Sequence, residues 1–390
     1  MVEPLLIDIS RLLDRAAKGR LPTGVDRVML AYLERWGDRS LAILQKGSWR
    51  RVLGPVHSQQ LFALLRQRPE RFAQRMNRVV AKACLPPWPR QQWPGAWALH
   101  LGQTGLENPG FVPWVRRSGQ KPVFFVHDLI PLTHPEYCRV GEGVHHQQRL
   151  KTMLHCAAAV VANSAQTLAD FERHAAGLGL PVPPGVVAPL APADLGQGAL
   201  QEPPLQDPYF VVLGTIEPRK NHLLLLNVWR ELAQQLGPHC PKLVVVGQRG
   251  WECEQVVDML ERCHAIHPHV LEVPRCTDQE LATWLRHARA LLFPSFAEGF
   301  GMPLVEALAM GTPVIASRLP VFQEVAGDTP DYLSPIDGAG WMQAVHDYLP
   351  VGSVRRLAQC QRMSNFAVPT WEAHFKKVES LLERLSWRRN

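Results

Sequence analysis

The sequence has no apolar run that approaches the roughly 18 residues needed to span a lipid bilayer. Its first residues, MVEPLLIDIS, lack the basic start and the apolar stretch of a secretory signal. These two absences predict a cytoplasmic protein, or one that binds a membrane from its cytoplasmic side.

None of the eight cysteines forms a C-x-x-C pair, which is a common signature of a zinc or redox site. We expect reduced thiols that are mostly buried. One group of metal-binding residue types is close together in the sequence: Cys263, His264, His267, His269 and Cys276. Its spacing matches no standard zinc pattern, so a solvated loop beside a strand is favoured over a metal site.

Short apolar runs bounded by turn residues alternate with helical patterns, which predicts parallel strands covered on both faces. The first series of strands is expected at 5–10, 40–44, 97–101, 122–128, 159–164 and 186–190. The second is expected at 209–214, 242–247, 270–273, 290–295 and 313–317. The sequence therefore predicts an α/β protein with two doubly wound, Rossmann-like domains.

The predicted domains are residues 1–190 and 207–369, joined by a linker at 191–206, with an amphipathic C-terminal helix within 370–390. Neither series has G-x-G-x-x-G after its first strand, which excludes the usual dinucleotide-binding fold. The sequence also lacks G-x-x-x-x-G-K-[ST], which excludes a P-loop NTPase.

The segment FPSFAEGFGMPLVEALAMGTPVIAS (293–317) predicts a strand, a glycine-containing loop and a helix. Pro303 suits the first turn of that helix and Gly311 its end. Free N–H groups at such a helix start favour a phosphate. Glu298 lies in the loop and Glu306 in the expected first turn, where one carboxylate can hold a sugar hydroxyl and the other a ribose diol. A tight turn with a solvated glutamate fits the spacing equally well.

A second segment, VVLGTIEPRKNH (211–222), also runs from a strand through a loop into a helix. Arg219 and Lys220 precede the helix that His222 begins, and Asn221 is the expected N-cap. Two adjacent cations at the carboxyl edge of a parallel sheet suit a diphosphate. A solvated basic turn is the alternative.

Together, GTIEPRKN and EGFGMPLVEALAMGTPVIAS, about 80 residues apart, resemble the retaining family 4 glycosyltransferases of the GT-B fold. With HDLIPL at 127–132, the combination is most similar to bacterial mannosyltransferases of surface polysaccharides. The resemblance implies two domains facing across a cleft, with the acceptor on the first and a nucleotide sugar on the second. It also implies that the C-terminal helix crosses back to the first domain.

The resemblance assigns roles to individual residues. Arg219 and Lys220 correspond to the residues that hold the donor diphosphate, Glu298 to the one at the donor sugar and Glu306 to the one at the ribose. The whole implied donor site is Gly214, Thr215, Arg219, Lys220, Glu298, Gly299, Phe300, Gly301, Met302 and Glu306.

In the first domain, FFVHDLIPLTHPEY (124–137) resembles the segment that places a histidine, here His127, against the reacting sugar. The implied catalytic residues are therefore His127, Glu298, Arg219 and Lys220. Asp128 and Gly24, the latter in LPTGVDRV (21–28), would line the cleft. A turn histidine with a capping aspartate, and a plain loop around Gly24, are the alternatives.

The implied reaction moves a hexose, with mannose favoured, from a nucleotide sugar such as GDP-mannose to a hydroxyl of a growing surface glycan or lipid-linked acceptor, with retention. No D-x-D motif is present, so we expect no metal or other cofactor. The positive charge is concentrated in one segment, so we expect no nucleic acid partner. One departure is the Val-Phe-Gln between Pro320 and Glu324. The alternatives are a GT-B epimerase or phosphorylase, a hydrolase using Glu298 and Glu306 as an acid–base pair, and a non-enzymatic anion-binding protein.

The net charge of +7 is concentrated in residues 50–90, which hold nine arginines and lysines and a single glutamate. This segment is predicted to form a patch facing the anionic inner surface of the plasma membrane, because cations are mixed with apolar side chains. Those apolar residues are Trp49, Leu61, Phe62, Leu64, Leu65, Phe72, Trp88 and Trp93. The alternative is a solvated helix face whose apolar residues belong to the core.

Overall fold

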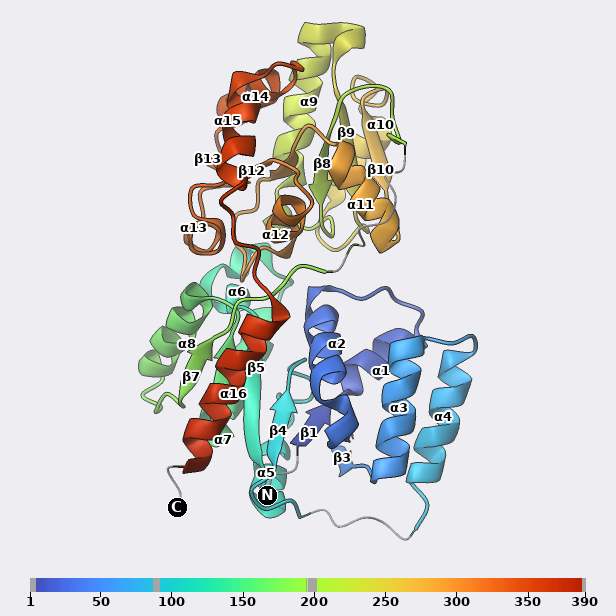
Figure 1. Ribbon diagram of the computed structural model, residues 1–390, viewed down its shortest axis with the longest axis vertical. Coiled ribbons are helices and arrows are strands. Elements are labelled where there is room, and N and C mark those ends of the chain that lie inside the picture. The colour runs from blue at the N-terminus through green and yellow to red at the C-terminus, as the bar shows by residue number, and fades with distance from the viewer. Residues whose placement is uncertain (1–4, 87–91, 194, 196–201, 388–390) are drawn as a thin grey trace. The chain divides into compact units, whose positions relative to one another are not determined.

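The computed structural model describes residues 5–86, 92–193, 195 and 202–387, and it divides into two compact units (Figure 1). Unit 1 takes its described residues from 1–132, 141–188 and 371–390, and unit 2 takes its own from 133–140 and 189–370. The chain therefore passes between the units four times. Part of the predicted linker, 194 and 196–201, lies outside the described residues, as do Trp88 and Arg90.

Unit 1 contains a seven-stranded sheet in the order β3-β2-β1-β4-β5-β6-β7. All neighbours are parallel except β2 and β3. The strands are β1 (Leu5–Asp8), β2 (Ser40–Lys46), β3 (Trp49–Val52), β4 (Trp97–His100), β5 (Lys121–Val126), β6 (Ala159–Ala162) and β7 (Gly185–Val187). The central strands are buried throughout, as expected for a sheet covered on both faces.

Helices cover this sheet, and the last one comes from the C-terminus of the chain. They are α1 (Ser10–Ala17), α2 (Gly24–Trp36), α3 (Pro55–Gln67), α4 (Phe72–Ala83), α5 (Phe111–Ser118), α6 (Ile130–Thr133), α7 (Glu142–Cys156), α8 (Ala165–Gly177) and α16 (Trp371–Trp387). Ser164 caps α8 as expected, since its hydroxyl accepts from Thr167 N at 3.1 Å. In α16, His374 Nε2 lies 2.9 Å from the Tyr32 hydroxyl of α2, so the C-terminal helix packs in unit 1 as the fold prediction required.

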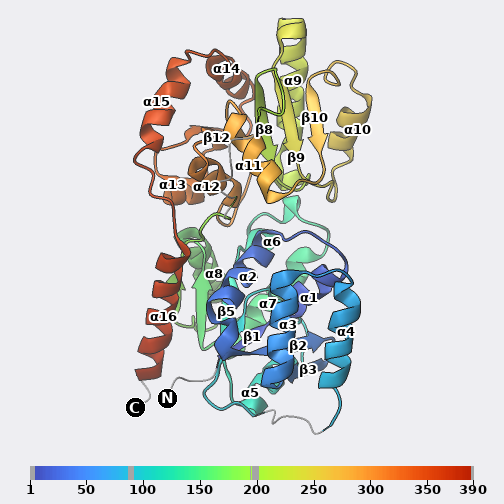
Figure 2. The ribbon, with the colours of Figure 1, turned by 45° about the vertical axis from the view of Figure 1, so that its right-hand side comes forward.

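The basic segment folds as β3, α3 and α4, with the two helices side by side (Figure 2). Four of its apolar side chains are buried in the core: Leu61, Phe62, Leu65 and Phe72. The predicted mixture of cations and apolar groups on one surface is wrong for these four, because their side chains are buried in the core. Cations at helical spacing remain exposed along α4: Arg71, Arg75, Arg78 and Lys82. We call these four the α4 stripe.

Unit 2 contains a six-stranded parallel sheet in the order β10-β9-β8-β11-β12-β13. The strands are β8 (Tyr209–Leu213), β9 (Lys242–Val246), β10 (Val270–Val273), β11 (Leu291–Phe293), β12 (Val314–Ser317) and β13 (Asp331–Leu333). The helices are α9 (His222–Leu236), α10 (Glu254–Arg262), α11 (Asp278–His287), α12 (Met302–Ala309), α13 (Pro320–Ala326), α14 (Gly338–Tyr348) and α15 (Val354–Met363). The predicted pair of Rossmann-like sheets is thus confirmed.

The cysteines differ from the expectation, because only Cys240 of the eight is buried and Cys84 is exposed. The other six are half-buried and none forms a disulfide. Within the described residues, no three His, Cys, Asp or Glu side chains are grouped so that they could hold a metal ion. In the same part of the chain, no helix combines the length and the apolar character needed to cross a membrane.

Candidate functional site

The loops after β8 and β11 meet where the strand order of the unit 2 sheet reverses. On one side of β8 the sheet continues with β9 and β10. On the other side of β8 it continues with β11, β12 and β13. Crevices at the carboxyl ends of strands beside such a reversal are the usual ligand sites of doubly wound sheets. The loop after β8 carries Arg219 and Lys220 in a short 3-10 helix (Pro218–Lys220), and the loop after β11 carries Glu298.

Glu298 is the centre of an ion-pair cluster that joins these two loops. Its carboxylate pairs with Arg219 Nη1 at 2.7 Å and with the Lys220 ammonium. The Ser295 hydroxyl donates to the same carboxylate at 2.8 Å. Arg219 also pairs with Glu217 at 2.6 Å. The structure therefore brings together three of the predicted site residues. Two of them, Lys220 and Glu298, are 78 positions apart in the sequence.

The charged side chains of the cluster stabilise one another's ionised forms, although they are buried. Burial raises the pKa of Glu298, but Arg219 and Lys220 outweigh it and lower that pKa to about 2. Burial lowers the pKa of Lys220, and Glu298 opposes this shift. Burial also raises the pKa of Glu217, and the positive charge of Arg219 opposes this shift. At neutral pH, Glu298 is therefore a carboxylate that holds two cations in place.

The glycine-containing loop lies beside this cluster and leads into α12. Pro303 is in the first turn of α12, as predicted. Glu306 is buried, but it lies in the second turn and not in the first, because the helix already begins at Met302. Gly301 has φ of 96°, and a Cβ there would lie 2.6 Å from Cε1 of Phe322. The Val-Phe-Gln departure thus supplies a ring that packs under the loop and stacks on Phe293 at 4.9 Å.

Gly301→Ala is expected to lower the free energy of unfolding by about 1–3 kcal/mol, because it adds left-handed strain and a clash with Phe322. Gly311→Ala is the matched control, since Gly311 also has positive φ (78°) but nothing lies within 4 Å of its Cβ position. Urea unfolding measures both. The larger loss at Gly301 should shrink when Phe322→Leu is added. Equal losses at the two glycines would contradict the clash.

In unit 1, His127 follows β5 at the carboxyl edge of its sheet. Its Nε2 is 2.7 Å from the carbonyl of Leu101, which can only accept, so Nε2 carries the proton. Burial lowers the pKa of His127, and the Leu101 carbonyl opposes this shift. The neutral ring thus presents Nδ1 as an acceptor. Asn163 Nδ2 fixes the backbone by donating to the His127 carbonyl at 2.8 Å.

The other predicted residues of unit 1 are held by local hydrogen bonds. Asp128 accepts from Ile130 N at 3.1 Å, as a capping aspartate does. Gly24 is the first residue of α2. A capping box between Thr23 and Asp26 stabilises the start of this helix. Asp26 is buried and pairs with Arg11 at 3.0 Å and with Arg15 at 2.7 Å. Both Arg11 and Asp26 influence the pKa of His127, so the Gly24 loop and His127 lie near each other.

Residues 133–140 come from the first half of the sequence but belong to unit 2. The ring of Tyr137 stacks on Phe296 with centroids 4.8 Å apart and planes 7° from parallel. Arg139 lies over the Trp251 ring at 4.7 Å. Phe296 is two residues before Glu298, so this segment packs directly beside the ion-pair cluster.

Sequence reasoning missed several contributors to the site. The sequence pattern assigns no role to Glu217, and it places Ser295 only at the end of the strand expected at 290–295. Their proximity in the sequence to Arg219 and Glu298 was the available signal. Nothing in the sequence indicated the stacking of Tyr137 on Phe296, because the two rings are 159 positions apart in the chain. Asn221 was also misassigned, and its side chain does not cap α9.

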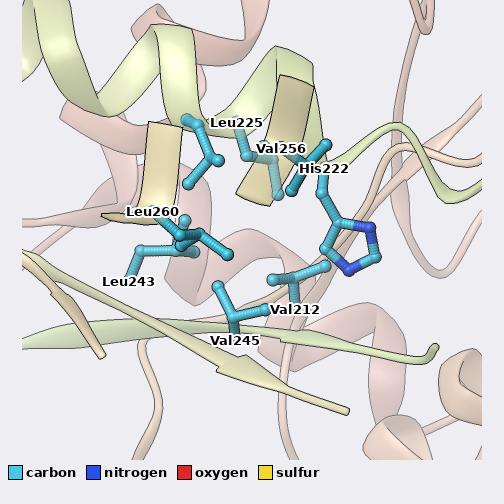
Figure 3. Close-up of a pocket in the computed structure, with 8 residues that line it drawn as sticks. Val212, His222, Leu225, Leu243, Val245, Val256 and Leu260 are labelled. Carbon is cyan, nitrogen blue, oxygen red and sulfur yellow. The ribbon is translucent and has the colours of Figure 1, made fainter. Parts of the chain in front are cut away.

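A gap in the core of unit 2 lies under α9 and α10 but has no room for a water molecule (Figure 3). It is lined by aliphatic side chains and by the His222 ring. Neither ring nitrogen of His222 has a hydrogen-bond partner among the described residues. Burial lowers the pKa of His222 from 6.5 to about 3, with Lys220 adding to the shift. The gap is therefore packing space and not a ligand site.

His222→Leu is expected to make the protein less sensitive to acid. Unfolded His222 takes up a proton below pH 6.5 while the folded ring stays neutral, so wild-type stability falls as pH drops from there towards 3. Between pH 7.5 and 5.5 this group accounts for about 1.4 kcal/mol. Urea unfolding at both pH values should show that difference for His222→Leu against wild type. The exposed His145→Leu is the matched control, and the same difference in that variant would contradict the assignment to His222.

Several known proteins are similar to this chain. Residues 207–349, within unit 2, match the family described as glycosyl transferases group 1. The serotype-specific mannosyltransferase WbdA of Escherichia coli is 29% identical over 254 residues, which cover 60% of this chain and 30% of that protein. O-antigen chain mannosyltransferase B of Escherichia coli is 32% identical over 162 residues, which cover 40% of this chain and 42% of that protein.

A solved structure matches along the whole chain. HepE from Anabaena, in complex with UDP-glucose, superposes with a TM-score of 0.63 at 15% identity, covering 99% of this chain and 98% of that one. The chain spans about a third of the first sequence relative and less than half of the second. The two sheets are of the GT-B type, residues 207–349 match the group 1 glycosyl transferases, and the chain is similar in sequence to mannosyltransferases of Escherichia coli.

Proposed function

We propose that this protein is a glycosyltransferase that moves a hexose, with mannose favoured, from a nucleoside-diphosphate sugar to a hydroxyl of a surface glycan or lipid-linked acceptor. The observation that carries the proposal is the cluster of Arg219, Lys220 and Glu298 beside the glycine loop of unit 2. Two fixed cations and a helix start suit a diphosphate. The match to the group 1 family and the relationship to mannosyltransferases support it.

In the proposed reaction, the bond between the sugar C1 and the donor phosphate oxygen breaks, and its electron pair leaves with the nucleoside diphosphate. The acceptor oxygen bonds to C1 on the same face, and its proton passes to the departing phosphate oxygen. Negative charge grows on the leaving diphosphate, so Arg219 and Lys220 lower the barrier. In this proposal Glu298, kept ionised, accepts hydrogen bonds from sugar hydroxyls, and Nδ1 of His127 is a further acceptor.

The reaction is proposed to need no metal, because protein cations supply the charge that a metal would bring to the diphosphate. Full activity in the presence of a chelator is the expected result. Activity that is lost with EDTA and restored by Mg²⁺ or Mn²⁺ would overturn this part of the proposal.

The experiment that tests the function incubates the protein with GDP-mannose, other GDP-sugars and UDP-sugars and measures released nucleoside diphosphate. A thermal-shift screen of GDP, UDP and dTDP ranks the donor bases, since a ligand bound to the folded state raises the melting temperature. Stabilisation by one diphosphate with sugar transfer supports the proposal. If no nucleoside diphosphate binds, the assignment of the cluster is wrong.

The hydrolase alternative fits less well with the structure. An acid–base pair of glutamates requires one carboxyl group that keeps its proton near neutral pH. The pKa of Glu298 is lowered to about 2, and its carboxylate is engaged by two cations. Glu298 is therefore unsuited to donate a proton to a leaving sugar.

We further propose that the α4 stripe binds the anionic inner surface of the plasma membrane, where lipid-linked acceptors would be available. Each lysine or arginine near such a surface contributes roughly 1 kcal/mol, so four suffice for reversible attachment. Co-sedimentation with vesicles should need anionic lipid, weaken with salt and fall when Arg71, Arg75 and Arg78 become Glu. Protein that stays in the supernatant with anionic vesicles at low salt would contradict this.

A further inference from the structure

Asn221 adopts a backbone conformation that few residue types tolerate. It lies between the 3-10 helix that carries Arg219 and Lys220 and the first residue of α9, with φ of 58° and ψ of 36°. Its side chain is 9% exposed and makes no cap to α9. Left-handed backbone costs roughly 1–2 kcal/mol for most residues and less for asparagine or glycine. The backbone conformation is therefore one reason why few residue types suit position 221.

The side-chain amide supplies a second reason. Nδ2 of Asn221 donates to the carbonyl of Pro294 at 3.1 Å and to the carbonyl of Pro335 at 2.8 Å. Pro294 is the first residue after β11, and Pro335 follows β13 by two residues. One buried amide thus ties together the loops after β8, β11 and β13 at the carboxyl edge of the unit 2 sheet.

Two of the three loops that this amide joins, those after β8 and β11, hold the ion-pair cluster. Next to it, Phe296 N donates to the Arg219 carbonyl at 2.9 Å, and Arg219 Nη1 donates to the Ala297 carbonyl at 3.0 Å. Lys220 precedes Asn221 directly, and Glu298 follows Pro294 by four residues. A shift of either loop would therefore separate the Lys220 ammonium from the Glu298 carboxylate.

We infer that Asn221 is a positioning residue that holds Lys220 and Glu298 in the arrangement needed at the donor, an inference that rests on the proposed function. A diphosphate in the ground state attracts nearby cations even when they are loosely held. Charge that develops as the diphosphate leaves is stabilised best by groups that need no reorganisation. Loss of the amide should therefore lower kcat more than it weakens nucleotide binding.

The test is Asn221→Gly, which keeps the left-handed conformation and removes only the amide. Its control is Glu252→Gly, because Glu252 also has positive φ (48°), lies in unit 2 and is exposed. We expect at least a tenfold fall in kcat for Asn221→Gly, with the dissociation constant for the nucleoside diphosphate within about threefold of wild type. Circular dichroism at the assay temperature shows whether each variant is folded.

A kcat within about threefold of the control would overturn the inference, because glycine would then replace everything that Asn221 contributes. If Asn221→Gly does not fold, Asn221→Asp takes its place under the same criterion, since aspartate keeps the volume but offers no donor to the two carbonyls. Failure of both to fold would assign Asn221 to the stability of the whole unit, and this also overturns the inference. A wild-type protein that binds no nucleoside diphosphate would instead contradict the proposed function.

Discussion

Lys220→Met is expected to lower kcat at least tenfold, which corresponds to about 1.4 kcal/mol of lost transition-state stabilisation. The ammonium is buried against Gly214 and the Phe293 ring, so no solvent cation takes its place. Arg219 still pairs with Glu298 in the variant, and the loop should stay folded. Release of nucleoside diphosphate under saturating donor measures the effect.

The matched control for this prediction is Lys242→Met. Lys242 begins β9 at the opposite, amino edge of the same sheet and pairs with Asp207 at 3.3 Å. Its replacement removes a partly buried lysine of unit 2 without touching the cluster, so kcat should stay close to wild type. If both variants lose activity to the same extent, Lys220 has no special part in catalysis.

Glu298→Ala should be among the most destabilising single changes in unit 2, at about 3–5 kcal/mol. Removing one member of a buried ion pair leaves the other uncompensated, and here two cations would lose their shared partner. The Ser295 hydroxyl would lose its acceptor as well. Urea unfolding at neutral pH measures the loss.

Two further variants make that measurement specific. Glu231→Ala removes a surface glutamate whose pair with Arg230 spans 4.0 Å, and a change below about 1 kcal/mol is expected. In the double variant Glu298→Ala/Lys220→Met, one of the unpaired cations is gone, so the total loss should be smaller than the sum of the single losses. Strictly additive losses would show that the two side chains do not interact in solution.

Where local signals agreed, the sequence predicted the fold closely. Each of the eleven expected strands is present, and α9 begins at His222 as predicted. Two strands were missed for different reasons. β3 contains Arg50 and Arg51 in its four residues, which indicated a charged surface segment. β13 has three half-buried residues, too few for a pattern to emerge.

The errors concern properties that depend on distant partners. The expected cap at Asn221 is typical of asparagine before a helix, yet its amide bonds to carbonyls 73 and 114 residues further along the chain. Leu61 and Phe62 were counted with neighbouring cations, although the side of α3 that faces the sheet is fixed by tertiary packing. Glu306 was expected in the first turn of α12, but it lies in the second because the helix begins at Met302, one residue before Pro303.

The four passages of the chain between the units bear on how related transferases can exchange parts. A chimera joined only at the linker would combine residues 133–140 of one parent with the Phe296 and Trp251 of another. It would also combine the α16 of one parent with the Tyr32 of the other. Functional recombinants should therefore carry both short segments together with the unit that each one packs on. Exchange of one whole unit between two such proteins therefore requires several crossovers.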